Sequence, residues 1–410
     1  MSDPNERFHG LTIGTIGAAH FGSHFLQLSL APILPLIRDD FGVSFLQLSW
    51  VLTVFYATSG IGQIVAGILV DRFGPHRLLM VGITLQSLAV LAMAIVPDYH
   101  WLFPLAFIAG LGNSVYHPAD LSILSRRIPQ HRLGRALATH VIGGSIGFAA
   151  APLVIGGLGA AFGWRVGLAS AGVVGLLIAA FVIAQRHALH APHIEHHDEG
   201  HPHRKLSPSF LAILSLPVIR LTFLFFALSS LNGAAIMNFG ATALTEGYEA
   251  TLALANVGIA IALGASIVGT FASGIIIDRG TPHRVVAVVA LVAGGAACLL
   301  AGAAAWPILL VIALLAIAEF FFGATLPPRD ITVREAVPAG SLGKSFGIVY
   351  SGLDAGQLVG PVIYGFLLDH SLPQFVFVVA GLAMLAMVPT LTGAWRKQPA
   401  AAKTLGGGAS

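Results

Sequence analysis

Twelve long apolar runs follow one another along the chain, each close to the roughly 20 residues that a helix needs to cross a bilayer. They lie at 11–37, 45–70, 77–97, 101–126, 134–160, 165–186, 216–243, 251–277, 284–304, 306–328, 342–368 and 373–395. Only 10% of the 410 residues are charged, against about a quarter in soluble domains. A soluble globular protein is therefore excluded, and the sequence predicts an all-α membrane protein with twelve transmembrane helices.

The positions of Lys and Arg predict how these helices are oriented. All of the 21 basic residues except Arg38 and Arg165 fall on the side of the predicted spans that also holds both termini. Because cytoplasmic loops are the ones enriched in positive charge, we expect both termini in the cytoplasm of a bacterial cell and a multi-pass position in its cytoplasmic membrane. The polar first ten residues lack a small-residue cleavage site, so we expect no cleaved signal peptide. The basic residues form no stripe, which argues against a nucleic-acid partner.

The chain repeats itself in the same orientation. GILVDRFGPHR at 67–77 recurs as GIIIDRGTPHR at 274–284, an offset of 207, and LGRA at 133–136 matches LGKS at 342–345, an offset of 209. Such a duplication predicts two parallel six-helix halves, an arrangement known in secondary transporters that bind their ligand between the halves. The predicted domains are the halves 1–186 and 216–397, a histidine-rich cytoplasmic linker at 187–215, and a disordered tail at 398–410.

The repeated loop resembles the signature loop between helices 2 and 3 of the major facilitator superfamily. The resemblance implies the major facilitator fold, and it implies that the loop acids act as a conformational switch by gripping helix ends. The alternative is that these charges only set the topology. The switch residues carried over are Gly67, Asp71, Arg72, Gly74, Arg77, Gly274, Asp278, Arg279 and Arg284, with the glycines expected to allow close helix approach.

Two further segments resemble the fosmidomycin-resistance branch of that superfamily. They are GLGNSVYHPADLSILSRR at 110–127 and LGRALATHVIGGSIGFAAAPLVIGG at 133–157. The resemblance implies export of small toxic compounds by proton antiport. In helix 1 the branch has a His followed four residues later by Asp, whereas here His20 is followed by His24.

Polar residues inside membrane-spanning helices are expensive and mark functional sites by default. In helix 1, His20, His24 and Gln27 share one face, and His24 near the midplane is a candidate proton carrier or a histidine bonded to a carbonyl. In helix 4, Asn113, Tyr116, His117 and Asp120 lie together, at a level where Pro118 loosens the helix. His117 is the preferred functional member, because Asp120 falls towards the cytoplasmic edge of the core.

The second half adds its own candidates for a substrate or proton pathway: Asn232, Asn238, Glu319, Arg329, Asp330, Asp354 and Gln357. The offset of 209 places Arg329 where Asp120 stands in the first half, which predicts a cytoplasmic gate pair. Asp354 matches Ser145 and has no acidic counterpart, so it is the first candidate for the coupled proton, followed by Glu319 and His24.

Seven of the 17 histidines lie in the linker: His187, His190, His193, His196, His197, His201 and His203. They indicate either a plain soluble tether or a zinc, nickel or copper site. No cofactor and no enzymatic motif is recognised, and no phosphate-binding loop for ATP is present.

The function predicted is therefore secondary active transport by alternating access in a monomer, with protons, a small-molecule substrate and the lipid bilayer as partners. Proton-coupled export of a small toxic or metabolic compound is the first choice. Organic anion uptake or exchange and divalent transition-metal export are the alternatives.

Overall fold

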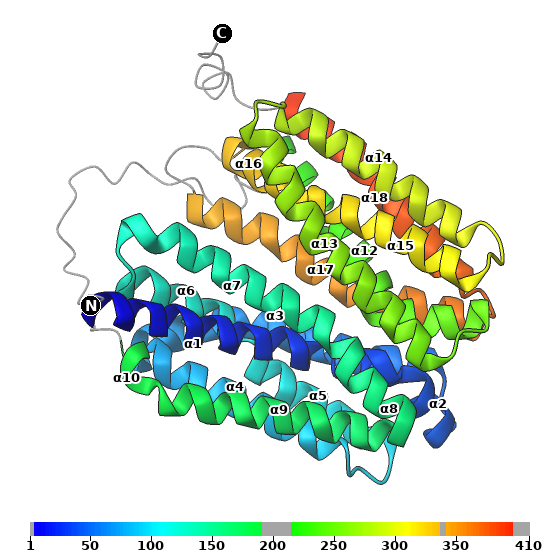
Figure 1. Ribbon diagram of the computed structural model, residues 1–410, viewed down its shortest axis with the longest axis horizontal. Coiled ribbons are helices and arrows are strands. Elements are labelled where there is room, and N and C mark those ends of the chain that lie inside the picture. Colours follow the sequence, from blue (N-terminus) through cyan, green and yellow to red (C-terminus); the bar gives the residue numbers. More distant parts are fainter. Residues whose placement is uncertain (1–3, 191–214, 337–341, 397–410) are drawn as a thin grey trace. The chain divides into compact units, whose positions relative to one another are not determined.

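The computed structural model describes residues 4–190, 215–336 and 342–396, which are helical almost throughout (Figure 1). The first part contains α1 Pro4–Gln27, the 3₁₀ turn η1 Ala31–Ile33, α2 Leu34–Phe41, α3 Phe45–Phe73, α4 Pro75–Met93, η2 Tyr99–Trp101, α5 Leu102–Asn113, α6 Tyr116–Arg127, α7 Gln130–Ala151, the π-helical turn η3 Pro152–Gly156, α8 Gly157–Phe162, α9 Trp164–Ala184 and α10 Arg186–Leu189. The second part contains α12 Pro217–Tyr248, α13 Leu252–Asp278, α14 His283–Gly302, α15 Ile308–Ala324, α16 Leu326–Ala336, α17 Leu342–Asp369 and α18 Gln374–Arg396. The predicted all-α fold is confirmed.

Nine helical segments of the described residues are long and apolar enough to cross a membrane. They are 45–73, 75–93, 130–162, 164–184, 217–248, 252–278, 283–302, 308–332 and 374–396. The other three predicted spans are occupied by α1, by α5 with α6, and by α17. These three contain most of the polar residues singled out above. Polar residues lower the apolarity of α1 and α17, whereas α5 and α6 are each only 12 residues long.

Prolines explain where the structure departs from the predicted helix boundaries. The first predicted span, 11–37, is wrong at its end: α1 stops at Gln27, and Pro32 and Pro35 begin two new short elements. The fourth span is interrupted between α5 and α6, because Pro118 has no N–H to donate to the carbonyl of Ser114. The tenth span has an equivalent interruption between α15 and α16, before Pro327, which matches Pro118 at the offset of 209.

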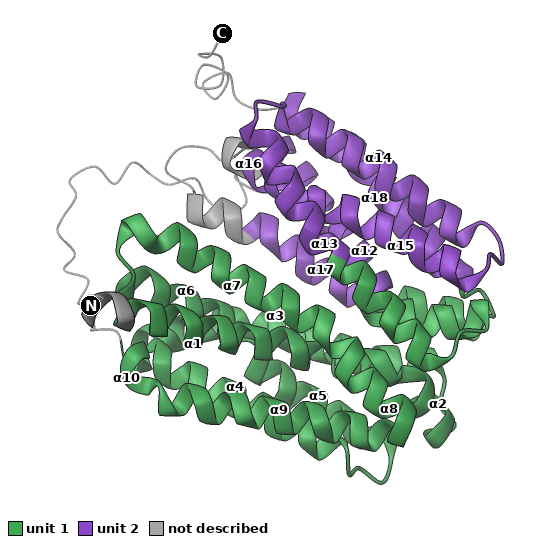
Figure 2. Cartoon of the chain, viewed as in Figure 1, with its two compact units in different colours: residues 1–194, 237–264, 361–373 green, residues 195–236, 265–360, 374–410 purple. Residues whose placement is uncertain are grey.

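The described chain forms two compact units (Figure 2). Unit 1 comprises residues 1–194, 237–264 and 361–373, and unit 2 comprises 195–236, 265–360 and 374–410. Unit 1 thus contains the first half of the duplicated sequence together with two segments of the second half, and unit 2 contains the rest of the second half. The predicted domain boundaries were drawn from the duplication in the sequence. They stay a prediction.

Small residues bring α1 and α7 into close contact in unit 1. A methyl group added to Gly143 would lie 2.5 Å from the carbonyl oxygen of Gly17, and one added to Gly147 would lie 2.4 Å from that of Phe21. No real Cβ approaches so closely, so both positions require glycine for this helix spacing. Close backbone approach of this kind is what small residues provide between membrane helices, where apolar burial from water gives no drive.

Charged side chains at one end of unit 1 join segments that are far apart in the sequence. Asp369, the last residue of α17, accepts hydrogen bonds from the backbone N–H of Phe45 at 2.8 Å and of Leu46 at 2.9 Å. Arg38 of α2 donates to Glu246 of α12 at 3.0 Å. This is the end that carries Arg38 and Arg165, the two basic residues assigned to the non-cytoplasmic side.

The signature loop is a one-residue connection between α3 and α4. Gly74 has φ +88°, a conformation that side chains rarely adopt, and its N–H bonds the carbonyl of Val70 at 3.0 Å. The second copy keeps such a residue, Gly280 with φ +95°, one position before the equivalent of Gly74. The expectation of close helix approach is wrong for Gly67 and Gly274, because a methyl group added to either would meet no atom within 4 Å.

These two glycine environments predict opposite effects of the same substitution. Gly74→Ala should reduce the free energy of unfolding by about 1–2 kcal/mol, because an L residue must then adopt a left-handed backbone. Gly67→Ala should be neutral or stabilise by up to about 1 kcal/mol through helix propensity. Chemical unfolding of the purified protein in detergent measures both. Equal losses in the two variants would show that the close-approach expectation holds for Gly67 after all.

Candidate functional site

Five ionisable side chains from three helices meet inside unit 1, and we call them the histidine–aspartate cluster: His20 and His24 of α1, His117 and Asp120 of α6, and His140 of α7. Asp120 is fully buried. Its Oδ2 atom lies 3.5 Å from Nδ1 of His20 and 3.6 Å from Nδ1 of His140. Asp120 was expected towards an exposed edge, and the structure places it at the centre of this cluster.

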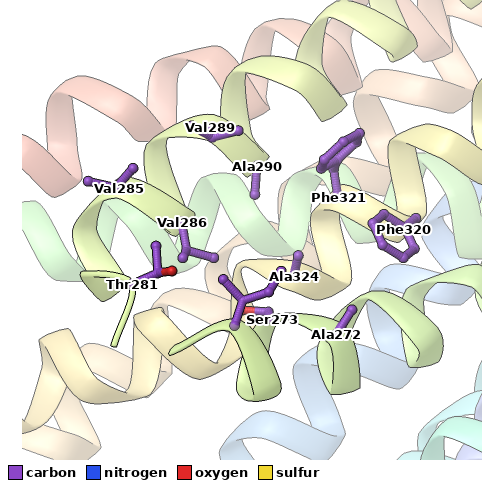
Figure 3. A pocket seen from close by; sticks show the side chains of 11 residues that line it. Ala272, Ser273, Thr281, Val285, Val286, Val289, Ala290, Phe320, Phe321 and Ala324 are labelled. Carbon is purple, nitrogen blue, oxygen red and sulfur yellow. The ribbon is translucent and has the colours of Figure 1, made fainter. Parts of the chain in front are cut away.

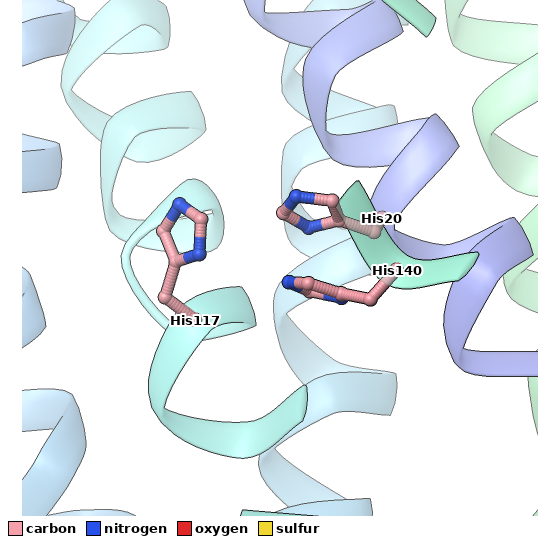
Figure 4. A group of neighbouring side chains, drawn as sticks. All are labelled: His20, His117 and His140. Atoms are coloured by element: carbon pink, nitrogen blue, oxygen red, sulfur yellow. The ribbon is translucent and has the colours of Figure 1, made fainter. Parts of the chain in front are cut away.

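The imidazole rings of the cluster are in contact (Figure 4). His20 and His140 stack with ring centroids 3.6 Å apart, and His117 presents its edge to His20 at 5.1 Å. His24 lies 4.4 Å from His20 on the same helix and stacks on Phe148. His20 and His140 are only 3% and 4% exposed, His24 is half-buried, and His117 is the exposed member of the cluster.

The sequence of α7 makes room for these rings. A methyl group on Gly144 would lie 2.7 Å from Cδ2 of His20 and 2.7 Å from Nδ1 of His24. Glycine at this position therefore allows the α1 histidines to lie flat against α7, one helical turn after His140. Gly143 thus allows the close spacing of α1 and α7, and Gly144 leaves space for the two imidazole rings.

Asn113 cross-links four helices beside the cluster. Its amide nitrogen donates to the hydroxyl of Ser59 in α3 at 2.8 Å. Its carbonyl oxygen accepts from Ser23 of α1 at 3.1 Å and from Gln86 of α4 at 3.3 Å. A predicted pathway residue is thus also a structural junction, because one amide satisfies three polar groups that α1, α3 and α4 contribute.

A second polar junction of unit 1 brings Gln27 and Asn238 together through Tyr56. The Tyr56 hydroxyl donates to Oδ1 of Asn238 at 3.0 Å and is also hydrogen-bonded to the side chain of Gln27. The three residues come from α3, α12 and α1. Two predicted pathway residues from opposite halves of the sequence therefore share one partner.

The predicted residues of unit 2 are more scattered. Arg329 donates to its neighbour Asp330 at 2.9 Å, and its guanidinium lies 4.9 Å from the ring centre of Phe226. Glu319 is 1% exposed in α15, near the thiol of Cys298. Asn232 is fully buried in α12, while Asp354 and Gln357 of α17 are half-buried. Asp120 and Arg329 lie in different units and each has partners in its own, so the gate pair stays a prediction.

Sequence reasoning missed His140, Tyr56, Ser23, Ser59 and Gln86. For His140 a signal was available, because it is a lone imidazole within the predicted span 134–160 and the argument applied to helix 1 applies equally to it. For Gln86 the same signal was available, because Gln27 was singled out as a polar residue inside a predicted span. Ser and Tyr recur in several predicted spans, and only packing shows which of them face Asn113 or Asn238.

The first signature loop makes one ion pair in unit 1. Asp71 accepts a hydrogen bond from Arg126, in the last turn of α6, at 3.1 Å. Asp71 itself is 73% exposed. The loop acid therefore holds the end of a neighbouring helix through a side chain, and α6 is the helix that carries His117 and Asp120.

The pocket that the structure shows in unit 2 is apolar and separate from these groups (Figure 3). It has a volume of about 220 Å³ and lies among α13, α14 and α15, with Phe320, Phe321 and Val286 in its wall. Its polar lining consists of Ser273 and Thr281. Of the linker histidines, His187 and His190 are described, with Nδ1 of His190 3.5 Å from Nε2 of His76, and the other five lie outside the described residues.

The junction at Asn113 gives a stability prediction. Asn113→Ala leaves the side chains of Ser23, Ser59 and Gln86 without this partner, so the free energy of unfolding should fall by about 1–3 kcal/mol. Ser145→Ala is the matched control, because its hydroxyl bonds only the carbonyl of Val141 in its own helix. Unfolding in detergent measures both. A loss no larger for Asn113→Ala than for Ser145→Ala would contradict the junction.

The chain is similar in sequence to known transport and resistance proteins. It is 29% identical to the fosmidomycin resistance protein of Escherichia coli over an alignment of 175 residues, and this alignment covers 42% of each of the two proteins. It is 25% identical over 175 residues to the niacin transporter NiaP of Acinetobacter baylyi, which covers 43% of this chain and 40% of that protein. The matched part of the chain thus spans less than half the length of these curated relatives.

The fold comparison covers nearly the whole chain. A bacterial homolog of the human lysosomal transporter Spinster, solved in an inward-facing and occupied conformation, superposes with a TM-score of 0.73 at 16% identity, covering 97% of each chain. The family model of the Major Facilitator Superfamily matches residues 16–282 and 222–409. The chain therefore belongs to the major facilitator superfamily of multi-pass membrane transporters.

Proposed function

We propose that this transporter exports a small toxic or metabolic compound from the bacterial cytoplasm in exchange for protons. The family supports transport, and the fosmidomycin resistance protein supports export. Proton coupling is supported by the position of Asp120, which is fully buried and lies within 3.6 Å of two imidazole nitrogens. Ionisable groups at membrane depth typically form proton relays or substrate sites.

The charges of the cluster explain how a proton would be held. With one proton shared between Asp120 and either His20 or His140, the group is a neutral acid beside neutral imidazoles or a compensated ion pair. Without that proton, Asp120 is a buried carboxylate with no counter-charge, which is strongly unfavourable. Protonation of the cluster thus lowers the free energy of the conformation in which the cluster is buried. Proton binding can therefore shift the equilibrium between this conformation and one in which the cluster is open to water.

Access to the cluster runs through His117, its exposed member. His117 and Asp120 are on α6, whose last turn is held by Asp71 through Arg126. We propose that Asp71, and Asp278 in the second copy, are switch residues that transmit the position of the loop to such helix ends. Glu319 and Asp354 are retained as further candidate proton carriers, since both are acids inside unit 2 helices.

The contacts made by Asp369, Arg38 and Glu246 are proposed to close the non-cytoplasmic end. They join segments from the two sequence halves within unit 1, so they must break if that end is to open. This assignment rests on the distribution of basic residues, which predicts both termini in the cytoplasm.

Organic anion uptake or exchange is the second candidate function. The relative named niacin transporter supports it, together with Arg329, a cation only 16% exposed beside an aromatic ring. Both candidates use the same fold, and the direction of driven flux distinguishes them.

Proton coupling is tested by flux measurements in proteoliposomes. A screen of fosmidomycin, niacin and related compounds by thermal stabilisation first identifies a substrate. Asp120→Asn and His140→Gln should abolish pH-driven transport while sparing exchange of substrate for substrate, because exchange needs no net proton movement. Glu319→Gln and Asp354→Asn are tested in parallel, and His131→Gln is the matched control on α7, where His131 is exposed. Full response of Asp120→Asn and His140→Gln to an imposed proton gradient would refute the assignment.

Closure at the Asp369 end is tested by labelling a buried cysteine. Ser49→Cys in a Cys298→Ala background places a thiol at a fully buried site of α3 near Gly365. Asp369→Asn weakens the cap on α3 by about 1 kcal/mol, so labelling should accelerate about fivefold. Asp98→Asn is the control, because Asp98 accepts its hydrogen bond from the backbone N–H of His100 in its own turn. Equal labelling rates in the two variants would show that Asp369 does not hold this end closed.

A further inference from the structure

Three imidazoles from three helices present nitrogen atoms to one small space. One ring nitrogen each from His20, His117 and His140 lies within 4.8 Å of the other two (Figure 4). The residues are separated by 97 and 23 positions in the sequence, so tertiary packing alone creates the group. Asp120 lies beside this group, with its Oδ2 atom 3.5 Å from Nδ1 of His20 and 3.6 Å from Nδ1 of His140.

The polar atoms of this group lack the hydrogen bonds that buried atoms normally have. Nδ1 of His20, Nδ1 of His140 and both oxygens of Asp120 are buried with no hydrogen-bond partner among the described residues. Each such atom destabilises the folded protein while it stays unsatisfied. A ligand that bonds several of these atoms at once would therefore gain binding free energy by satisfying them.

The distances match the spacing of metal ligands better than that of hydrogen bonds. The Nδ1 to Oδ2 separations of 3.5 and 3.6 Å exceed the usual limit of about 3.2 Å for a hydrogen bond. In a tetrahedral zinc site with bonds of about 2.0–2.1 Å, neighbouring ligand atoms are about 3.3–3.4 Å apart. To reach that spacing around one ion, the stacked rings of His20 and His140 must rotate until a nitrogen of each points at the ion.

We propose that His20, His117, His140 and Asp120 form a binding site for a transition-metal dication of the zinc class. Imidazole nitrogens with one carboxylate suit Zn²⁺, Co²⁺, Ni²⁺ and Cu²⁺, whereas Mg²⁺ and Ca²⁺ prefer oxygen ligands. The exposed His117 provides the route by which the ion enters. The site is independent of the linker histidines and does not depend on the proposed export function.

Metal binding is tested on the full-length protein with the seven linker histidines replaced by Asn, purified with a tag that contains no histidine. Equilibrium dialysis against Zn²⁺ should yield one ion per chain in this background. Bound Co²⁺ should give the intense visible absorption of a tetrahedral site with nitrogen and oxygen ligands. The linker background removes His190, and with it the His76–His190 pair, as a competing site.

His117→Ala and His140→Gln should each weaken Zn²⁺ binding by about tenfold or more. His131→Gln, on the same helix as His140 but exposed, should leave it unchanged. His117→Ala alters an exposed side chain and so keeps the test valid if His140→Gln fails to fold. Absence of stoichiometric Zn²⁺ in the background protein, or unchanged affinity in His117→Ala, would overturn the proposal and favour a purely protonic cluster. Since binding needs no transport, its outcome is separate from that of the flux experiments.

Discussion

The bilayer forces a chain with so few charges to satisfy internally every polar group that it keeps between its helices. Unit 1 shows how this works: the amide of Asn113 bonds three helices, and the hydroxyl of Tyr56 joins Gln27 to Asn238. The histidine–aspartate cluster departs from this pattern at several adjacent atoms. It concentrates buried donors and acceptors that the described residues leave unbonded, and this unmet capacity is what a proton or a metal ion can use.

The backbone features that build the cluster come from a few residue types. Gly143 and Gly147 let α1 approach α7, and Gly144 leaves space for two rings. Pro118 interrupts the fourth span next to His117, so α6 begins as a separate helix whose first residues face the cluster. Asp71 pairs with Arg126 in the last turn of the same helix. One short helix thus connects the signature loop to the buried carboxylate.

Much of the fold could be predicted from the sequence, because apolar length and proline positions are local properties. The twelve runs correspond to helical segments, and the effect of Pro118 was expected, whereas the interruption at Pro32 was not. The α1 and α6 members of the cluster were found because they share helix faces with their neighbours. His140 was missed although its place inside the predicted span 134–160 marks it as a candidate, and only the packing of α7 against α1 shows that it lies beside His20. The duplication pointed from Asp120 to Arg329, whereas the partners seen within unit 1 are imidazoles.

We propose that Asp120 and its two imidazoles hold the proton that the substrate displaces. Proton release on substrate addition, followed with a pH-sensitive dye in weakly buffered detergent solution, tests this most directly because no membrane gradient is involved. We expect proton release from the unmodified protein and none from Asp120→Asn at equal substrate occupancy. Equal release from both proteins would contradict it and place the exchanged proton elsewhere in the chain.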